Sequence, residues 1–216
     1  MVCRHCMRGN MQPIDMSKAI VDKVLEPIER IGSVTFTGGE PLLNVPIIRY
    51  FTDQVQERKI PLSSFFVVTN GKKVDMEFVH CLIDLYDYVD DDDGMSGLEM
   101  SQDQFHEDVE VPKIYKALKF FHPDARKVHF RGDSIINSGH ARTNRIGSRV
   151  SREGSFSFND YDESTITPEM LYLAANGNVI HDCDYSYYHI DKYAAGNIMK
   201  TPLLDILMSK REEVEA

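Results

Sequence analysis

Two cysteines near the start of the chain have the spacing that most directly suggests chemistry. Cys3 and Cys6 lie in the stretch VCRHCMRGN, in a CxxC arrangement. Such a pair can chelate zinc, ligate an iron–sulfur cluster or form a redox disulfide. A zinc ribbon needs a second CxxC pair, which the chain lacks, and a thioredoxin-type site needs a strand directly before the pair. From these residues alone, two interpretations are equally favoured: a metal-binding pair, and two thiols with no chemical role.

A glycine-rich stretch further along could hold a ligand. TFTGGEPLLN places Gly38, Gly39 and Glu40 directly after a run rich in β-branched residues. Two glycines let the backbone approach a ligand closely, and the carboxylate that follows can accept hydrogen bonds from an amine. Taken alone, however, GGE is more often a tight turn before a helix.

Alternating strand and helix patterns surround these residues. Apolar and β-branched runs predict buried strands at 33–37, 65–71, 98–101 and 127–130. Amphipathic or capped segments predict helices at 15–31, from Asn44 onward, at 75–87 and at 112–121, and Pro27 should kink or end the first of them. Strands that alternate with helices predict βαβ units and a parallel sheet, with functional loops at the carboxyl ends of the strands. GGE, TNG (69–71) and the residues after LEMS (98–101) fall at such ends.

This pattern stops after residue 135. Residues 136–168 are rich in Ser, Gly, Asn, Asp and Arg, and we expect them to form a long connection. MLYLAANGNVIH (170–181) predicts a β-hairpin that turns at Asn176–Gly177, and TPLLDILMSKREEV predicts a final amphipathic helix. We therefore expect two parts, at 1–135 and 136–216.

Composition narrows the class of protein. The 216 residues are 42% hydrophobic and 27% charged, as in a globular protein, with a net charge of −10 and no basic run. This argues against a nucleic-acid partner. No apolar run is long enough to span a membrane and no signal peptide is visible, so we expect a cytoplasmic protein without a membrane partner. Four cysteines, Cys3, Cys6, Cys81 and Cys183, do not make a disulfide framework in a chain of this length, and a reducing compartment fits them.

Taken together, CxxC, GGEP, TNG and EMSQDQFH (99–106) resemble the radical S-adenosylmethionine (SAM) superfamily over residues 1–135. The segment NGNVIHDCDYSYYHIDKYAAGNIMKTPLLDI more weakly resembles the SPASM/twitch-type C-terminal extension of members that modify peptides and proteins. The resemblance implies an α/β fold, a partial (β/α)6 barrel that lacks its first strand, followed by a small α+β cap-like extension.

The resemblance also assigns roles to individual residues. It implies that Cys3 and Cys6 hold two irons of a 4Fe–4S cluster and that SAM binds at Met7, Gly38, Gly39, Glu40, Asn70, Ser101 and Asp103. In this scheme the GGE loop binds the methionine amino group, and the backbone near Met7 meets the adenine. Asn70, Ser101 and Asp103 reach the ribose or the carboxylate. Arg142 is a further candidate for an anionic group, although a solvated loop arginine is the commoner explanation.

The activity implied is the generation of a 5′-deoxyadenosyl radical that abstracts hydrogen from a substrate. An electron donor such as ferredoxin or flavodoxin would be needed, and the cap-like extension favours a peptide or protein substrate. The alternative is a degenerate, cluster-free binding module with the same fold and no catalytic activity. A zinc or thiol-redox CxxC protein is a third, weaker option.

The chain departs from the family motif at one position. The motif CxxxCx(aromatic)C has a first cysteine four residues before Cys3, and the chain has none there, so the cluster should be labile. An N-terminal truncation, a degenerate member and a ligand from outside would each explain this, and we favour truncation. A truncated chain would be inactive as given.

Overall fold

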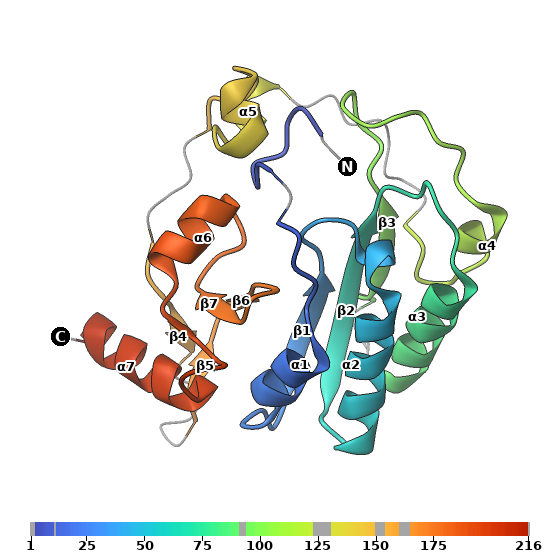
Figure 1. Ribbon diagram of the computed structural model, residues 1–216. Coiled ribbons are helices and arrows are strands. Elements are labelled where there is room, and N and C mark those ends of the chain that lie inside the picture. The colour runs from blue at the N-terminus through green and yellow to red at the C-terminus, as the bar shows by residue number, and fades with distance from the viewer. Residues whose placement is uncertain are drawn as a thin grey trace. The chain divides into compact units, whose positions relative to one another are not determined.

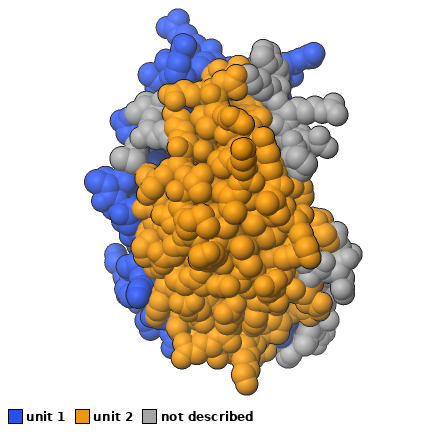
Figure 2. Space-filling view, turned by 90° about the vertical axis from the view of Figure 1, so that its right-hand side faces the viewer, with its two compact units in different colours: residues 1–27, 131–216 blue, residues 28–130 orange. Residues whose placement is uncertain are grey.

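The computed structural model describes residues 3–10, 12–90, 94–122, 131–149, 154–159 and 165–215 (Figure 1). They belong to two compact units, shown in different colours in Figure 2, and each is described by itself. The sheet unit is residues 28–130, and the cysteine unit is residues 1–27 together with residues 131–216. The sequence instead suggests a boundary after residue 135, and that domain division stays a prediction.

A parallel sheet organises the sheet unit. Its strands are β1 (Ile31–Phe36), β2 (Leu62–Thr69) and β3 (Gly97–Met100), in that order. Val34 of β1 pairs with Phe65, and Val67 of β2 pairs with Leu98. Because the strands are parallel, the loops that follow them lie at the same edge of the sheet (Figure 1). The (β/α)6 barrel stays a prediction, and the described residues establish a mixed α/β unit.

Helices connect the strands and cover the sheet. The elements between strands are η1 (Pro41–Leu43), α2 (Val45–Glu57) and α3 (Met76–Tyr88). The Asp75 carboxylate caps α3 by accepting from the backbone N–H groups of Glu77 and Phe78, which satisfies two donors that the helix leaves unpaired. The core is apolar, with Val55, Phe65, Val67, Phe78, Cys81, Leu82, Leu85 and Leu98 fully buried. Cys81 is therefore a core residue, as its place on the helix stripe predicts.

The predicted helix at 112–121 is wrong in length. Only Lys113–Lys116 forms a helix, α4. Phe121 instead makes a parallel β-bridge with Leu98: the Leu98 N–H donates to the Phe120 carbonyl, and the His122 N–H donates to the Leu98 carbonyl. Pairing with β3 thus overrides the helical pattern of this segment. The strand predicted at 127–130 lies outside the described residues.

The cysteine unit combines the N-terminal loop with the C-terminal part of the chain. Its helices are α1 (Lys18–Leu25), η2 (Gly132–Ser134), α5 (Gly139–Thr143), α6 (Tyr187–Tyr193) and α7 (Leu203–Glu215). Its strands are the pair β4 (Phe158–Asn159) and β5 (Thr167–Pro168), and the sheet of β6 (Tyr172–Leu173), β7 (Asn178–Ile180) and β8 (Gly196–Asn197). The predicted hairpin is confirmed, because β6 and β7 are antiparallel and Gly177 at the turn has φ +86°. The first predicted helix ends at Leu25, before Pro27. No helix among the described residues has the length and apolar character needed to cross a membrane.

Candidate functional site

The two N-terminal cysteines lie at the ends of a tight turn. The Cys6 N–H donates to the Cys3 carbonyl at 3.2 Å, which closes the CxxC segment, and Gly9 just beyond it has φ +86°. Both cysteines are half-buried, and none of the four cysteines takes part in a disulfide. A closed turn with two accessible thiols is suited to hold soft metal ions.

Helix α5 holds the backbone of this turn. The His140 N–H donates to the Cys6 carbonyl at 2.9 Å, and Nδ1 of the His140 ring donates to the Cys3 carbonyl at 3.3 Å. Nδ2 of Asn144 donates to the Arg4 carbonyl at 3.0 Å. Three carbonyls of the turn are thus fixed by α5 and its C-cap residue Asn144, which lie far away in the sequence. Sequence reasoning missed His140, and considered only Arg142 in this segment, which is exposed.

The residues after the turn are held by the C-terminal part of the same unit. The Tyr187 N–H donates to the Arg8 carbonyl at 3.1 Å, and the Arg8 guanidinium donates to the Tyr185 carbonyl at 2.7 Å. Met7, which the family resemblance places near an adenine, belongs to this anchored segment. The loop is therefore positioned on both sides of Cys6 by residues from 140 to 187.

The other cysteines are poorer ligand candidates. Cys81 is buried in the sheet unit, and burial raises the pKa of its thiol to about 11. Burial also raises the pKa of Cys183, and the neighbouring Asp184 and Asp182 add to the rise. Because the thiolate is the metal ligand, a raised pKa disfavours metal binding at both positions. A metal at Cys183, His181 and His189 stays a weak prediction, since His181 lies beside the Tyr185 hydroxyl and His189 beside that of Ser186.

The GGE and TNG loops contact each other in the sheet unit. The Glu40 carboxylate accepts from the Thr69 hydroxyl at 2.6 Å and from the Asn70 N–H at 2.9 Å. It also accepts from the Asn70 side-chain amide and from the Leu42 N–H. Glu40 thereby ties the loop after β1 to the loop after β2. With four donors on its two oxygens, an incoming amine would have to displace one of them.

The two glycines of the GGE loop have different roles. Gly38 has φ +113°, a backbone conformation that favours glycine. Gly39 has an ordinary φ, and a Cβ built there would meet nothing within 4 Å. Its backbone therefore borders open space, as a ligand-binding loop requires.

Removal of the Glu40 charge should loosen this pair of loops. We expect Glu40→Gln to lower the free energy of unfolding by about 2 kcal/mol. The charge-assisted hydrogen bonds are lost, and the new side-chain NH2 group faces N–H and O–H donors that it cannot accept from. Urea unfolding followed by circular dichroism measures the change. Glu110→Gln, at an exposed position of the same unit, is the control and should change little. Equal midpoints for the two variants would contradict the structural role of Glu40.

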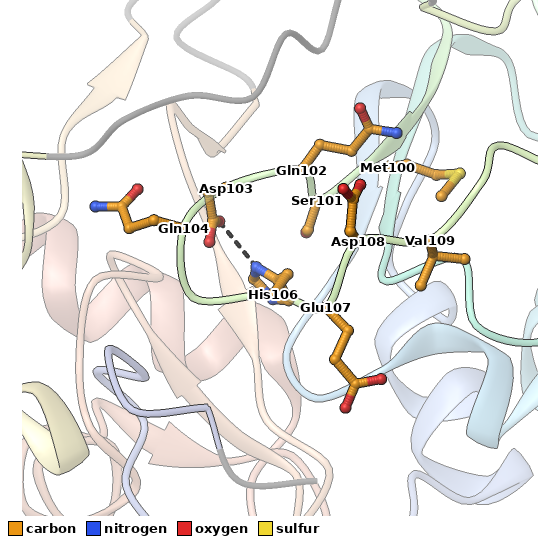
Figure 3. Close-up of a pocket in the computed structure, with 9 residues that line it drawn as sticks. All are labelled: Met100, Ser101, Gln102, Asp103, Gln104, His106, Glu107, Asp108 and Val109. Carbon is orange, nitrogen blue, oxygen red and sulfur yellow. Dashed lines mark hydrogen bonds and ion pairs between the residues drawn. The ribbon is translucent and has the colours of Figure 1, made fainter.

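The loop after β3 carries a small cavity of about 210 Å³, lined by residues between Met100 and Val109 (Figure 3). Ser101 continues the sheet, since its N–H donates to the Thr69 carbonyl at 2.8 Å. Asp103 is engaged within its own loop: one oxygen accepts from the Phe105 N–H and the other lies 2.8 Å from Nδ1 of His106. The Asp103 carboxylate therefore orients the imidazole, as Figure 3 shows. The Asp-x-x-His spacing is the sequence signal that could have paired them.

The predicted site residues thus fall into two groups. Cys3, Cys6 and Met7 belong to the cysteine unit, whereas Gly38, Gly39, Glu40, Asn70, Ser101 and Asp103 belong to the sheet unit. Within the second group the structure brings Glu40 and Asn70 into direct contact and places Ser101 at the end of the neighbouring strand. Their contacts with SAM stay predictions.

Comparison with known families concerns the first of these groups, the cysteines of the N-terminal turn. Residues 1–90 match the family described as a 4Fe-4S single cluster domain. A 4Fe–4S cluster-binding domain is indicated. The match includes the Cys3–Cys6 turn together with the GGE and TNG loops. No curated protein and no solved structure matches the chain.

The donor set of the turn fits the cluster in part. Two half-buried thiols at the ends of a closed turn suit two irons, which Cys3 and Cys6 would hold as thiolates. A 4Fe–4S cubane has two further irons, and their ligands must come from outside this turn.

Proposed function

We propose that the chain is a radical SAM protein, with a 4Fe–4S cluster at Cys3 and Cys6 and SAM bound beside it. The observation that supports this most directly is the contact between Glu40 and Asn70, two residues selected from separate motifs. They meet at the carboxyl edge of a parallel sheet, within the residues that match a 4Fe–4S family. This edge is where α/β proteins place their ligands.

Each group of residues has a physical task in this function. The thiolates of Cys3 and Cys6 would hold iron, and His140 would keep their turn in one conformation. The open backbone at Gly39 would approach the methionine moiety of SAM, and Glu40 would fix the loop that presents it. In the loop after β3, Asp103 would orient His106 toward the ligand.

The cluster and SAM would supply the hard chemistry. With both bound at these residues, one electron from an external donor such as ferredoxin or flavodoxin would allow SAM to be cleaved to methionine and a 5′-deoxyadenosyl radical, which would become 5′-deoxyadenosine by taking a hydrogen atom from the substrate. The chain's own residues bind, orient and exclude water. A peptide or protein substrate is favoured by the resemblance of the C-terminal extension, whose hairpin and third strand β8 are present.

Reductive cleavage of SAM tests this function. The chain would be reconstituted without oxygen with iron, sulfide and dithiothreitol, whose thiolate can serve as the additional ligand. Dithionite and SAM are then added, and 5′-deoxyadenosine is measured by mass spectrometry. We expect product from the reconstituted chain and none from the Cys3→Ser/Cys6→Ser double variant.

Two results would count against the proposal. A chain that carries about four irons and four sulfides with dithiothreitol in place of the missing ligand, yet forms no 5′-deoxyadenosine, is not a radical SAM enzyme. Binding of SAM or of a peptide that is unaffected by iron chelation, measured by calorimetry, would instead favour the cluster-free binding module.

A further inference from the structure

Arg8 is a buried cation two residues after Cys6. Its side chain is only 5% exposed, which is rare for arginine. The guanidinium donates to the Tyr185 carbonyl through Nη1 at 2.7 Å and lies 4.5 Å from the centre of the Tyr172 ring. These contacts fix the position of the charge within the cysteine unit.

The contacts do not neutralise the charge. No carboxylate among the described residues forms an ion pair with Arg8. Its guanidinium contacts a carbonyl and an aromatic face, and its charge also acts on the Tyr187 phenol and on the Cys183 thiol, whose pKa burial raises. A guanidinium stays protonated in proteins, so it cannot avoid the cost of burial by losing a proton. A buried charge without an opposite charge is expensive, and proteins normally pair it. The structure thus holds a positive charge whose counter-charge is not among the described side chains around it.

The CxxC turn is the nearest proposed metal site to this charge along the chain. Arg8 and Cys6 are two residues apart, so their Cα atoms are separated by at most about 7.6 Å. The Tyr187 phenol lies within the electrostatic range of both: burial raises its pKa, Arg8 opposes the rise and Cys6 adds to it. The backbone N–H of Tyr187 also donates to the Arg8 carbonyl, which fixes the segment there.

We propose that Arg8 is the buried counter-charge of the iron–sulfur cluster and raises its reduction potential. Reduction adds one electron to the cluster and breaks no bond, so the reduced state is more negative by one charge. A fixed cation at short range stabilises that state more than the oxidised one, and burial prevents solvent and salt from screening the interaction. This role rests on the cluster of the proposed function, but not on SAM cleavage. Arg8 acts as a tuning residue, not as a ligand.

Arg4 offers a matched control. It lies between Cys3 and Cys6 and carries the same charge, but its side chain is exposed. The midpoint potential of the reconstituted chain would be measured by titration with dithionite, following the electron paramagnetic resonance of the reduced cluster. We would compare the unaltered chain with Arg8→Gln, Arg8→Lys and Arg4→Gln at low and high ionic strength. Iron and sulfide are counted for each sample.

We expect Arg8→Gln to shift the midpoint to a more negative potential by the same amount at both ionic strengths. Arg8→Lys, which keeps the charge, should stay nearer to the unaltered chain, and Arg4→Gln should show a smaller shift that salt removes. An Arg8→Gln protein with full iron and an unchanged midpoint would overturn this role. If Arg8→Gln retains no iron, retention by Arg8→Lys supports a charge role, and loss by both variants indicates packing and overturns it. An unaltered chain that takes up no iron counts against the cluster itself. Failure of the proposed function is thereby distinguished from failure of the role of Arg8.

Discussion

Replacement of Cys6 by serine is expected to abolish the iron–sulfur cluster. With dithiothreitol as the additional ligand, the unaltered chain should take up about four irons and four sulfides on anaerobic reconstitution and absorb at about 400 nm. Cys6→Ser should reduce the iron and sulfide content and the absorbance to near background. Serine cannot supply a soft thiolate, and Cys3 would then be the only thiol left in the turn. Cys3→Ser should act in the same way. Iron and sulfide assays together with the absorbance spectrum measure the effect.

Cys183→Ser is the matched control for this loss. Cys183 belongs to the same unit and is also half-buried, but burial raises the pKa of its thiol. We expect this variant to retain the full cluster. Circular dichroism should show the same secondary structure in all variants, because the Cys6 contacts that hold the turn are backbone contacts. Equal iron in Cys6→Ser and Cys183→Ser would exclude the CxxC turn as the cluster site.

Much of the sheet unit could be predicted from the sequence because its signals are local. Strands β1 and β2 contain β-branched or aromatic runs, α2 and α3 have apolar stripes, and Asp75 caps α3. Once the strands are taken as parallel, residues that follow them must share an edge. The contact between Glu40 and Asn70 confirms this reasoning, although the two residues are far apart in the sequence.

The support of the cysteine turn could not be predicted in this way. His140 lies in a Ser- and Gly-rich segment with no periodic pattern, and its partners are the carbonyls of Cys3 and Cys6. Any residue offers a carbonyl, so a contact of this kind leaves no trace in residue type. The burial of Arg8 is hidden for a similar reason: an arginine in a polar N-terminal stretch is expected to be exposed.

The predicted helix at 112–121 is wrong in length for a different physical reason. Its composition favours a helix, and four residues do form one. The bridge between Phe121 and Leu98 adds hydrogen bonds at the edge of the sheet and buries two aromatic rings, Phe120 and Phe121. Such tertiary pairing is worth more than the weak helical preference of a few residues.

Substitution of Gly139 by alanine should detach the cysteine turn from α5. Gly139 has φ +51°, and a Cβ built there would lie 2.4 Å from both the Met7 carbonyl oxygen and the Gly9 nitrogen. Both atoms belong to backbone, so a side-chain rotation cannot relieve the clash. Left-handed strain and overpacking together cost about 2 kcal/mol, which lowers the ratio of docked to undocked turn by a factor of about 30.

Two measurements report this detachment. The His140 N–H donates to the Cys6 carbonyl, so its hydrogen exchange should accelerate by a similar factor in Gly139→Ala. Loss of iron to a chelator should also be faster, because the thiolates are no longer held by a fixed turn. Gly177→Ala is the control, since Gly177 also has a positive φ, +86°, but lies in the β6–β7 hairpin. It should destabilise that hairpin and leave both the His140 exchange rate and iron release unchanged. If Gly139→Ala instead matches the unaltered chain in both measurements, α5 does not hold the turn, and the stability of the cluster must come from elsewhere.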